Sequence, residues 1–344
     1  MLVAMAAGVT YLAWRLFFTL NTGALWLSFP VWAAELYGVV AAGLLFFTVW
    51  HPTRRPAPPA LPGHSVDVVI VAGDEPLWMV RRAVLGALAV RYPHATWVLD
   101  ASGRPETAQM ARELGSLYMA VAGASRAEAL NRVLEQSNAE FLTVFDADQV
   151  PAPEFLDRTL GYFTDPQVAF VQTSQDFYNV DSYQHRFDAE SRRTWHDQVL
   201  FFRVVQPGRD RWNAALFTGA CAVLRRSALE DVGGFAPEVV AEGLHTSLRL
   251  HARGWKSVYH DEVLAYGLAP VAAGPYHAQR LRRDRGAMQL LRRANPLTIP
   301  GLTLPQRLSY LAALSAPFEG FQRLVYYLTP PVYLFTGILP VREV

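Results

Sequence analysis

Two long apolar stretches, Leu2–Leu20 and Ala24–Trp50, open the chain. Each is long enough to cross a bilayer as a helix. The residues between them, Asn21-Thr22-Gly23, predict a tight turn. Residues 1–50 are therefore predicted to form a transmembrane helical hairpin. A signal peptide is the alternative for the first stretch, but no basic region precedes that stretch and a second apolar stretch follows at once.

Charged residues and prolines add detail to this pattern. Arg15 and Glu35 are costly to place in lipid, so we expect them to face protein or an interface. Residues 51–64 are rich in proline, which predicts a stiff linker. Arg54 and Arg55 lie in this linker close to the hairpin, which places the linker and the N-terminus on the cytoplasmic side of the membrane.

Between Val66 and about Tyr259, short apolar runs alternate with amphipathic segments. The predicted strands are 66–71, 95–99, 117–121, 141–145 and 168–173, and the predicted helices are 77–91, 106–114, 127–136 and 154–163. This alternation predicts an α/β fold with a largely parallel sheet and helices on both faces. Neither G-x-G-x-x-G nor G-x-x-x-x-G-K-[ST] occurs, so neither a dinucleotide-binding fold nor a P-loop is favoured.

The second half of the chain has a less regular pattern. It predicts three helices, a long one over Tyr183–Val205, one over Glu242–Arg253 and a strongly basic one over Tyr276–Arg293. A buried apolar segment is predicted at Phe217–Leu224. The last two predicted elements belong to the membrane, an amphipathic helix that lies along it over Leu302–Leu314 and a third crossing over Phe318–Leu339. Pro330-Pro331 is expected to bend the last of these. The basic helix is compatible with a solvated or membrane-surface face and also with anion binding.

Composition narrows the possible functions. The chain has 344 residues, of which 51% are hydrophobic and 18% are charged, and its net charge is +1. A nucleic-acid partner has little support, because proteins that bind nucleic acids usually carry a marked basic surplus. Cys221 is the single cysteine, which excludes an internal disulfide and a cysteine-based zinc site.

The strongest chemical signal is a pair of carboxylates after a predicted buried strand. Asp146 and Asp148 follow the apolar run 141–145, and residues two apart at strand spacing point to the same side. Asp100 ends a neighbouring predicted strand, and the carboxyl ends of such strands are where α/β sheets bind ligands. Paired carboxylates suit Mg²⁺ or Mn²⁺ bound to a diphosphate. The alternative is a strand-to-helix turn with Asp148 near the start of the next helix.

Several pieces of the chain, in their order and spacing, resemble one family. They are the hairpin, Val98-Leu99-Asp100, the Asp146–Asp148 pair, Phe217–Arg226, Leu244–Trp255 and Gln279–Arg282. The chain resembles the processive family-2 glycosyltransferases of the cellulose synthase type, specifically the bacterial catalytic subunit. The resemblance implies a GT-A fold, with a Rossmann-like and mostly parallel sheet, over residues 65–295. Residues 296–344 would then be an interface helix and a third transmembrane helix.

The resemblance also implies a function and partners. Such enzymes transfer glucose from UDP-glucose to a growing β-glucan with inversion, depend on Mg²⁺ or Mn²⁺, and pass the product out through their own helices. They are multi-pass proteins of the bacterial inner (plasma) membrane with a cytoplasmic catalytic domain. The implied partners are a UDP-sugar donor, a glucan acceptor, membrane lipid and an accessory synthase subunit.

By the same resemblance, four residues belong to the donor side. Asp100 contacts the uracil and ribose part of UDP, and Arg126 stands where the nucleotide pocket has a lysine. Asp146 and Asp148 hold the metal and the diphosphate. The sequence departs from the family near Asp100, where D-D-G reads Asp-Ala-Ser, and at 71–75, where the aromatic residue of P-x-Y-N-E is missing.

The acceptor side departs from the family pattern more strongly. Gln279 and Arg282 match the Q-x-x-R-W motif that carries the terminal acceptor sugar, but the tryptophan is replaced by Arg283. The aspartate of the T-E-D motif, which supplies the catalytic base, is replaced by Gly243, whose side chain cannot take a proton. Glu242 is adjacent, but neighbouring helix residues diverge by about 100°, so Glu242 would need a local shift to act as the base.

Two alternatives follow from these departures. One is a catalytically impaired pseudoenzyme that serves as a binding or scaffold subunit of a polysaccharide synthase. The other is a lipid-linked sugar transferase, because a fold alone does not determine the acceptor. The later membrane helices and the PilZ domain of the family are not in this sequence, which is compatible with a fragment of a longer protein.

Overall fold

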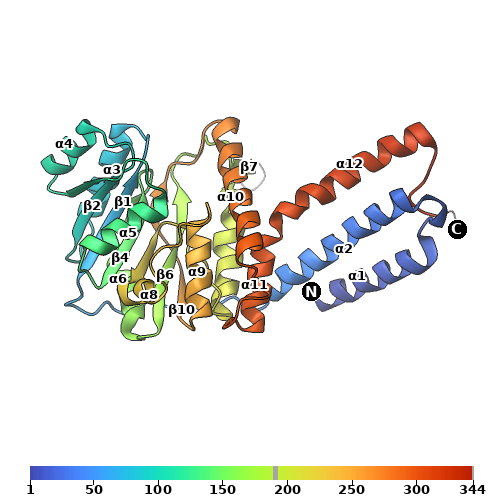
Figure 1. Cartoon of the computed structure of the whole chain (residues 1–344), viewed down its shortest axis with the longest axis horizontal. Coiled ribbons are helices and arrows are strands. Elements are labelled where there is room, and N and C mark those ends of the chain that lie inside the picture. The colour runs from blue at the N-terminus through green and yellow to red at the C-terminus, as the bar shows by residue number, and fades with distance from the viewer. Residues whose placement is uncertain (189–192, 343–344) are drawn as a thin grey trace. The chain divides into compact units, whose positions relative to one another are not determined.

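The computed structural model describes residues 1–188 and 193–342. It divides into two compact units (Figure 1). One unit joins Met1–Trp50 to the C-terminal residues from Arg307 onward, and the other is formed by His51–Gln306. The first contains the apolar hairpin and the second contains the predicted α/β domain.

The apolar unit is built from helices. They are α1 (Leu2–Trp14), η1 (Arg15–Thr19), η2 (Thr22–Ala24), α2 (Leu25–Thr48), η5 (Ala316–Phe318) and α12 (Glu319–Thr336), with α11 (Leu304–Leu314) leading into them. The turn between α1 and α2 forms as predicted, since the Asn21 side chain accepts a hydrogen bond from the Gly23 N–H at 3.0 Å. Arg15 is buried and its Nε lies 3.1 Å from Glu35 Oε2, so the two charges of the hairpin neutralise each other.

In the described part of the chain, two helical segments are long and apolar enough to cross a membrane, Leu2–Thr19 and Thr22–Thr48. The third predicted crossing forms a helix, α12, which continues through Pro330-Pro331 and packs against α2 through a hydrogen bond from Gln322 to the Ala34 carbonyl. This helix is not one of the two segments that pass the test of length and composition. The third membrane crossing therefore stays a prediction.

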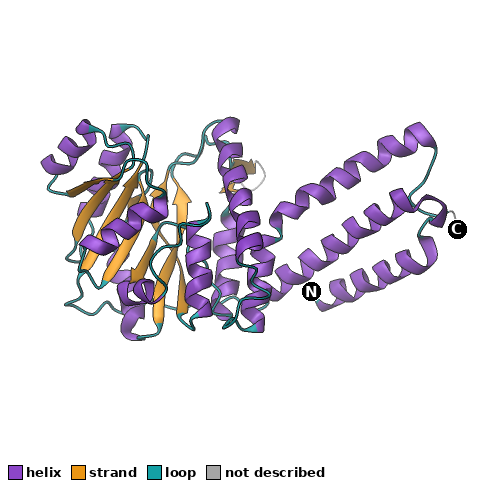
Figure 2. Cartoon of the chain, viewed as in Figure 1, coloured by secondary structure: helices purple, strands orange, loops and turns teal. Residues whose placement is uncertain are grey.

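One mixed sheet organises the second unit (Figure 2). Its strand order is β3-β2-β1-β4-β9-β6-β10-β5. The strands are β1 (Val66–Ala72), β2 (Ala95–Asp100), β3 (Leu117–Ala120), β4 (Phe141–Asp146), β5 (Val150–Pro151), β6 (Val168–Phe177), β9 (Ala222–Arg225) and β10 (Lys256–Gly267). The pairs among β1 to β4 and the pair β6–β10 are parallel, whereas β9 runs antiparallel between β4 and β6. The prediction of a mostly parallel α/β sheet is confirmed.

Helices cover both faces of the sheet, because the apolar side chains of β1 point alternately to one face and to the other. Val68 and Ile70 pack on one face with α3 (Leu77–Leu88), α4 (Pro105–Glu113) and α6 (Phe155–Thr159). Val69 packs on the other face with α5 (Arg126–Gln136), α8 (Arg226–Asp231) and α9 (Glu242–Ala252). Successive strand residues point to opposite faces, so an uninterrupted apolar strand requires this two-sided cover.

The prediction of a long helix over Tyr183–Val205 is wrong. The segment contains an antiparallel pair, β7 (His185–Asp188) and β8 (Arg193–His196), followed by a short π-helix, η4 (Phe201–Val205). Residues 189–192 of the predicted helix lie outside the described residues. Aromatic and polar residues alternate here without a stripe at helical spacing, which favours paired strands. The predicted helix 154–163 is also shorter, because its second half is a 3₁₀ turn, η3 (Leu160–Thr164).

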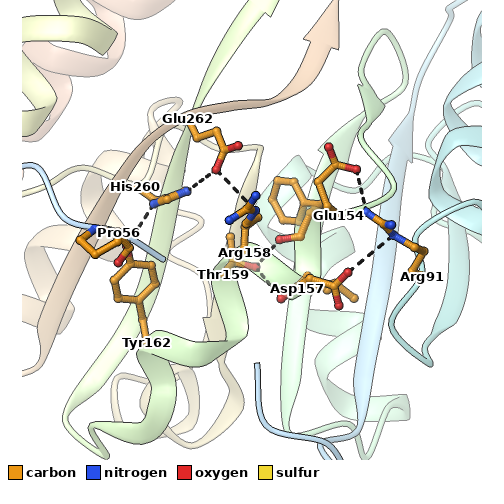
Figure 3. A network of polar contacts seen from close by, with 11 residues as sticks. Pro56, Arg91, Glu154, Asp157, Arg158, Thr159, Tyr162, His260 and Glu262 are labelled. Carbon is orange, nitrogen blue, oxygen red and sulfur yellow. Dashed lines mark hydrogen bonds and ion pairs between the residues drawn. The ribbon is translucent and has the colours of Figure 1, made fainter. Parts of the chain in front are cut away.

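The proline-rich segment 51–64 lies along the sheet domain. The Tyr162 hydroxyl donates to the Pro56 carbonyl at 3.3 Å, and the Tyr92 hydroxyl donates to the Leu61 carbonyl at 2.8 Å. Figure 3 shows a chain of polar contacts from Tyr162 to His260, from His260 to Glu262, and from Glu262 to Arg158. These contacts connect η3, β10 and α6. The segment is thus held at several points by hydrogen bonds from side chains of the sheet domain.

Candidate functional site

The carboxyl edge of the parallel strands brings the predicted aspartates into one region. Val71 pairs with Asp146 and Ala72 pairs with Asp100 in the register of β1 with its two neighbours. Asp100 and Asp146 are therefore two strands apart at the same edge, a separation of about 10 Å at ordinary strand spacing. This edge is the position at which open α/β sheets bind ligands.

At this edge Arg126 joins two of the predicted site residues. Its Nη1 forms an ion pair with Asp146 Oδ1, and its Nε lies 3.1 Å from Glu242 Oε1. Its Nη2 donates to the Gly219 carbonyl at 2.8 Å. We refer to Arg126, Asp146 and Glu242 as the arginine cluster. Burial by itself would lower the pKa of Arg126, but the charges of Asp146 and Glu242 outweigh it and raise that pKa, so the guanidinium stays charged.

Local sequence explains why Arg126 stands at this place. Ser125 caps α5, because its Oγ accepts from the Glu128 N–H at 3.3 Å while the Glu128 carboxylate accepts from the Ser125 N–H at 2.7 Å. This reciprocal capping box fixes the first turn of the helix. Arg126 is the first residue of that turn, so the cap determines where its side chain begins.

Asp148 lies in the turn after β4 and has an unusual environment. Burial, the neighbouring charge of Asp146 and the charge of Glu75 together raise the pKa of Asp148 to about 7. The charges of Asp146 and Glu75 thus act on Asp148, and neighbouring carboxylates are a suitable setting for a cation. The described residues contain no group of three or more His, Cys, Asp or Glu placed for a metal. Two carboxylates do fit Mg²⁺ or Mn²⁺, which take further ligands from water and substrate phosphates.

Asp100 is fully buried and holds the loop that follows β2. Its Oδ1 accepts from the Ser102 N–H at 3.0 Å, and its Oδ2 accepts from the Arg104 N–H at 2.8 Å and from the Tyr118 hydroxyl at 3.2 Å. Arg104 in turn donates to the carbonyls of Gly73 and Glu75, both at 2.8 Å. Asp100 and Arg104 therefore connect the loops after β1 and β2 on the side where a nucleotide is expected.

Gly243 faces the backbone of the segment before β9. A Cβ built on it would lie 2.6 Å from the Phe217 carbonyl oxygen and 2.8 Å from the Gly219 nitrogen. Ser247 fastens the same junction, since its Oγ donates to the Gly243 carbonyl and accepts from the Phe217 N–H, both at 2.8 Å. The position therefore leaves no room for a side chain, and the carboxylate at the start of α9 is that of Glu242.

The predicted acceptor residues lie on α10 (Ala273–Arg293). Gln279, Arg282 and Arg283 are exposed. The helix approaches the arginine cluster one turn later, because a Cβ on Gly286 would lie 2.6 Å from the Ala241 Cβ. Arg282 stands four residues before Gly286, on the same face of the helix.

Buried glutamines support the site and were not identified from the sequence. Gln149 Oε1 accepts from the Asp146 N–H at 3.0 Å, and its Nε2 donates to Gln175 at 2.9 Å. Gln172 Oε1 accepts from the Thr218 N–H at 2.9 Å, and its Nε2 donates to the carbonyls of residues 220 and 221. A glutamine within an apolar strand was the available signal for Gln172, since such a residue needs buried partners.

Cys221 lies beneath the site and not within it. Burial, followed by the charges of Asp146 and Asp148, raises the pKa of its thiol well above the usual range, so the thiol stays protonated. Its φ of 55° is unusual for a residue other than glycine. The backbone there accepts from Gln172 and donates to the Val144 carbonyl, and these bonds hold the conformation.

Comparison with known proteins agrees with this geometry. The family model described as glycosyltransferase-like family 2 matches residues 62–286, and the model described as cellulose synthase matches residues 230–344. The UDP-forming cellulose synthase catalytic subunit of Komagataeibacter sucrofermentans is 37% identical over 344 residues, covering 95% of this chain and 45% of that protein. The corresponding subunit of Xanthomonas axonopodis pv. citri is 36% identical, covering 94% of this chain and 46% of that protein.

The lengths of the relatives and the solved structures complete the comparison. The chain spans less than half the length of these two relatives. Among solved structures, the mannosyltransferase PcManGT from Pyrobaculum calidifontis, in complex with GDP-Man and Mn²⁺, has a TM-score of 0.68 and 20% identity, covering 90% of this chain and 88% of that one. This likeness shows the GT-A fold. The chain belongs to family 2 of the glycosyltransferases and, within it, is similar to the bacterial cellulose synthase catalytic subunits.

Proposed function

We propose that the protein is a membrane-bound, metal-dependent glycosyltransferase that moves glucose from UDP-glucose to a growing β-glucan with inversion. The observation that carries this proposal is the arginine cluster. It joins Asp146, expected at the metal and diphosphate, to Glu242, expected at the acceptor, through a single guanidinium at the ligand-binding edge of the sheet. The similarity to UDP-forming cellulose synthase subunits supports the choice of donor and product.

On the donor side, Asp146 and Asp148 would hold Mg²⁺ or Mn²⁺. The cation, when bound, would stabilise the negative charge that grows on the leaving diphosphate. Arg126 is placed to add a second positive charge to the same oxygens. Asp100 would support the nucleotide site by holding, together with Arg104, the loops after β1 and β2.

On the acceptor side, Glu242 is the proposed base. An inverting transfer needs one carboxylate that takes the proton of the attacking hydroxyl as the new bond forms. Gly243 cannot supply it, and backbone atoms of residues 217–219 fill the space where its side chain would stand. Glu242 is mostly buried at the start of α9 and faces Arg126, which holds its carboxylate at the sheet edge.

The acceptor chain would approach along α10. Gln279 can hydrogen-bond sugar hydroxyls, and the planar guanidinium groups of Arg282 and Arg283 can stack on a sugar ring or pair with phosphate. Arg283 takes the place of the aromatic platform expected from the family. The exposed position of all three residues leaves them accessible to such a ligand.

The apolar surface of the first unit supports the proposal that the protein lies in the bacterial inner membrane. Large apolar side chains are exposed on α1, η1, α2 and α12, including Phe17 at 76% and Phe335 at 90%. Water-exposed apolar surface of this extent is expected only where lipid or another protein covers it. We propose contact with membrane lipid, a cytoplasmic sheet domain, and an accessory synthase subunit as a further partner.

The test is release of UDP from UDP-glucose by the purified chain in detergent with Mg²⁺ or Mn²⁺. Asp146→Asn and Asp148→Asn should each abolish release while leaving the melting temperature close to that of the parent. Release that persists in both variants would rule the proposed site out. UDP binding without turnover would favour the scaffold alternative, and a radiolabelled product that partitions into organic solvent would favour the lipid-linked one.

A further inference from the structure

Arg126 occupies the place in which a cation is expected. Its side chain is 18% exposed and contacts the carboxylates of Asp146 and Glu242 together with the Gly219 carbonyl. A divalent cation held by Asp146 would therefore lie within a few ångströms of a permanent positive charge. Like charges at such separations repel strongly in a partly buried site.

We propose that Arg126 is a resident counter-ion that competes with the divalent cation for Asp146, so that the free protein binds the cation weakly until a nucleotide diphosphate takes over the guanidinium. The inference rests on the proposed function, since it places a nucleotide diphosphate at this edge. It adds the order of binding and the residue responsible for that order.

The geometry allows this exchange without loss of the side chain's anchor. Only Nη1 of Arg126 contacts Asp146, whereas Nε and Nη2 contact Glu242 and Gly219. The guanidinium can thus release Asp146 and remain attached at two points. Diphosphate oxygens would then share the arginine and the cation, which makes nucleotide and cation bind with positive coupling.

Arginine has a property here that a lysine would lack. Its planar group reaches three acceptors in different directions at once, whereas an ammonium is a compact point charge on a flexible stem. A lysine at position 126 would form a weaker bridge between Asp146 and Glu242. Arg126→Lys should therefore show cation binding intermediate between those of the parent and an uncharged variant.

The experiment measures Mn²⁺ binding by the full chain in detergent, from the electron paramagnetic resonance signal of free Mn²⁺, with and without UDP. In the absence of UDP, Arg126→Gln should bind Mn²⁺ at least about tenfold more tightly than the parent, since a nearby like charge is removed. In calorimetry the same variant should bind UDP about tenfold more weakly, because a charged partner of the diphosphate is lost. Arg132→Gln, an exposed site on the same helix, should change neither affinity.

The opposite signs distinguish competition from a structural role. If Arg126 only supported the fold, its replacement would weaken both affinities, and this result would overturn the inference, as would unchanged Mn²⁺ binding. Should Arg126→Gln not fold, Glu242→Gln provides the second test. It removes the rival partner of the guanidinium, so Mn²⁺ binding without UDP should become weaker than in the parent, and an equal or tighter affinity would contradict the proposal.

Asp146→Asn separates failure of the inference from failure of the proposed function. It should abolish Mn²⁺ binding both with and without UDP. If Mn²⁺ binds the parent equally well with and without UDP, the inference fails while the proposed function stands. If Mn²⁺ does not bind the parent even with UDP, both fail.

Discussion

Gly243 and Phe217 are so close that a Cβ on the glycine would lie 2.6 Å from the phenylalanine carbonyl oxygen. The aspartate expected at this position therefore cannot be added to the present backbone without moving the segment before β9. That segment also supplies the Gly219 carbonyl to Arg126, so a shift there would disturb the arginine cluster. The glycine is thus a packing requirement of this chain.

Restoring the aspartate should therefore not restore activity. We expect Gly243→Asp and Gly243→Ala each to destabilise the fold by about 1–3 kcal/mol, the usual cost of overpacking. Both should lower the rate of UDP release. Thermal unfolding and UDP release of the two variants provide the measurement. Gly274→Ala is the matched control, because no atom lies within 4 Å of a Cβ there. A more active Gly243→Asp variant would show that the backbone adapts and that the missing aspartate is the base.

Removing the proposed base should slow the reaction and leave the fold intact. Glu242→Gln keeps the size of the side chain but cannot take a proton, and general bases contribute about 10²–10⁴ in rate. We expect UDP release to fall by that factor, with the melting temperature within a few degrees of the parent. Glu238→Gln, four residues earlier and half exposed, should release UDP at the parental rate. Equal rates for Glu242→Gln and the parent would exclude Glu242.

The junction between the proline-rich segment and η3 should be sensitive to a single methyl group. A Cβ on Gly161 would overlap the Pro58 carbonyl oxygen, and the backbone cannot yield as a flexible side chain can. Gly161→Ala should detach residues 51–64 and lower stability by about 1–3 kcal/mol. Limited proteolysis should then cut this segment faster than in the parent. An unchanged digestion pattern would show that the segment is not held at this point.

Stability should fall in weak acid because of His251. Its pKa is lowered to about 3 by burial and then by the charge of Arg209, whereas an unfolded histidine has a pKa near 6.5. The unfolded state therefore binds one more proton between these two values, and stability is lost as the pH falls through that window. The loss is about 1.4 kcal/mol per pH unit for one such group.

The contribution of His251 to the pH dependence of stability can be obtained by comparing the parent with a His251 variant. The melting temperature of the parent should drop from pH 7.5 to pH 5, and the drop should be smaller in His251→Gln, whose amide can still reach the Ser257 hydroxyl that lies 2.9 Å from Nε2. Other histidines, including His245, add to the total drop but are common to both proteins. Parallel curves for the two proteins would contradict the assignment.

Replacing only one partner of the ion pair in the hairpin should lower stability more than replacing both. Arg15→Met leaves Glu35 without its counter-charge in an apolar unit, and removing one partner of a buried pair typically costs about 3–5 kcal/mol. The double variant Arg15→Met with Glu35→Gln should recover most of that loss. Thermal unfolding in detergent of the two single variants and the double variant gives the coupling. Additive losses would show that the two residues do not act as a pair.

The sequence alone determined the order of elements and the chemical classes at the sheet edge. Uninterrupted apolar strands alternating with amphipathic helices require a two-sided cover, so the α/β sheet and its carboxyl edge follow from local pattern. Asp100, Asp146 and Asp148 were predicted to meet at that edge because they end or follow strands. Local pattern failed at residues 183–205, where paired strands depend on partners that only folding brings together.

Tertiary structure decided what these residues contact. Arg126, Asp146 and Glu242 lie on three different elements, and no spacing along the chain predicts that one guanidinium joins them. The same holds for Gly243. In the sequence it looks like a lost catalytic residue, whereas in the structure the backbone of residues 217–219 leaves no room for a Cβ at this position. The physical reason is common to both cases. Periodicity determines which face a side chain occupies, whereas distances between elements depend on how the whole core packs.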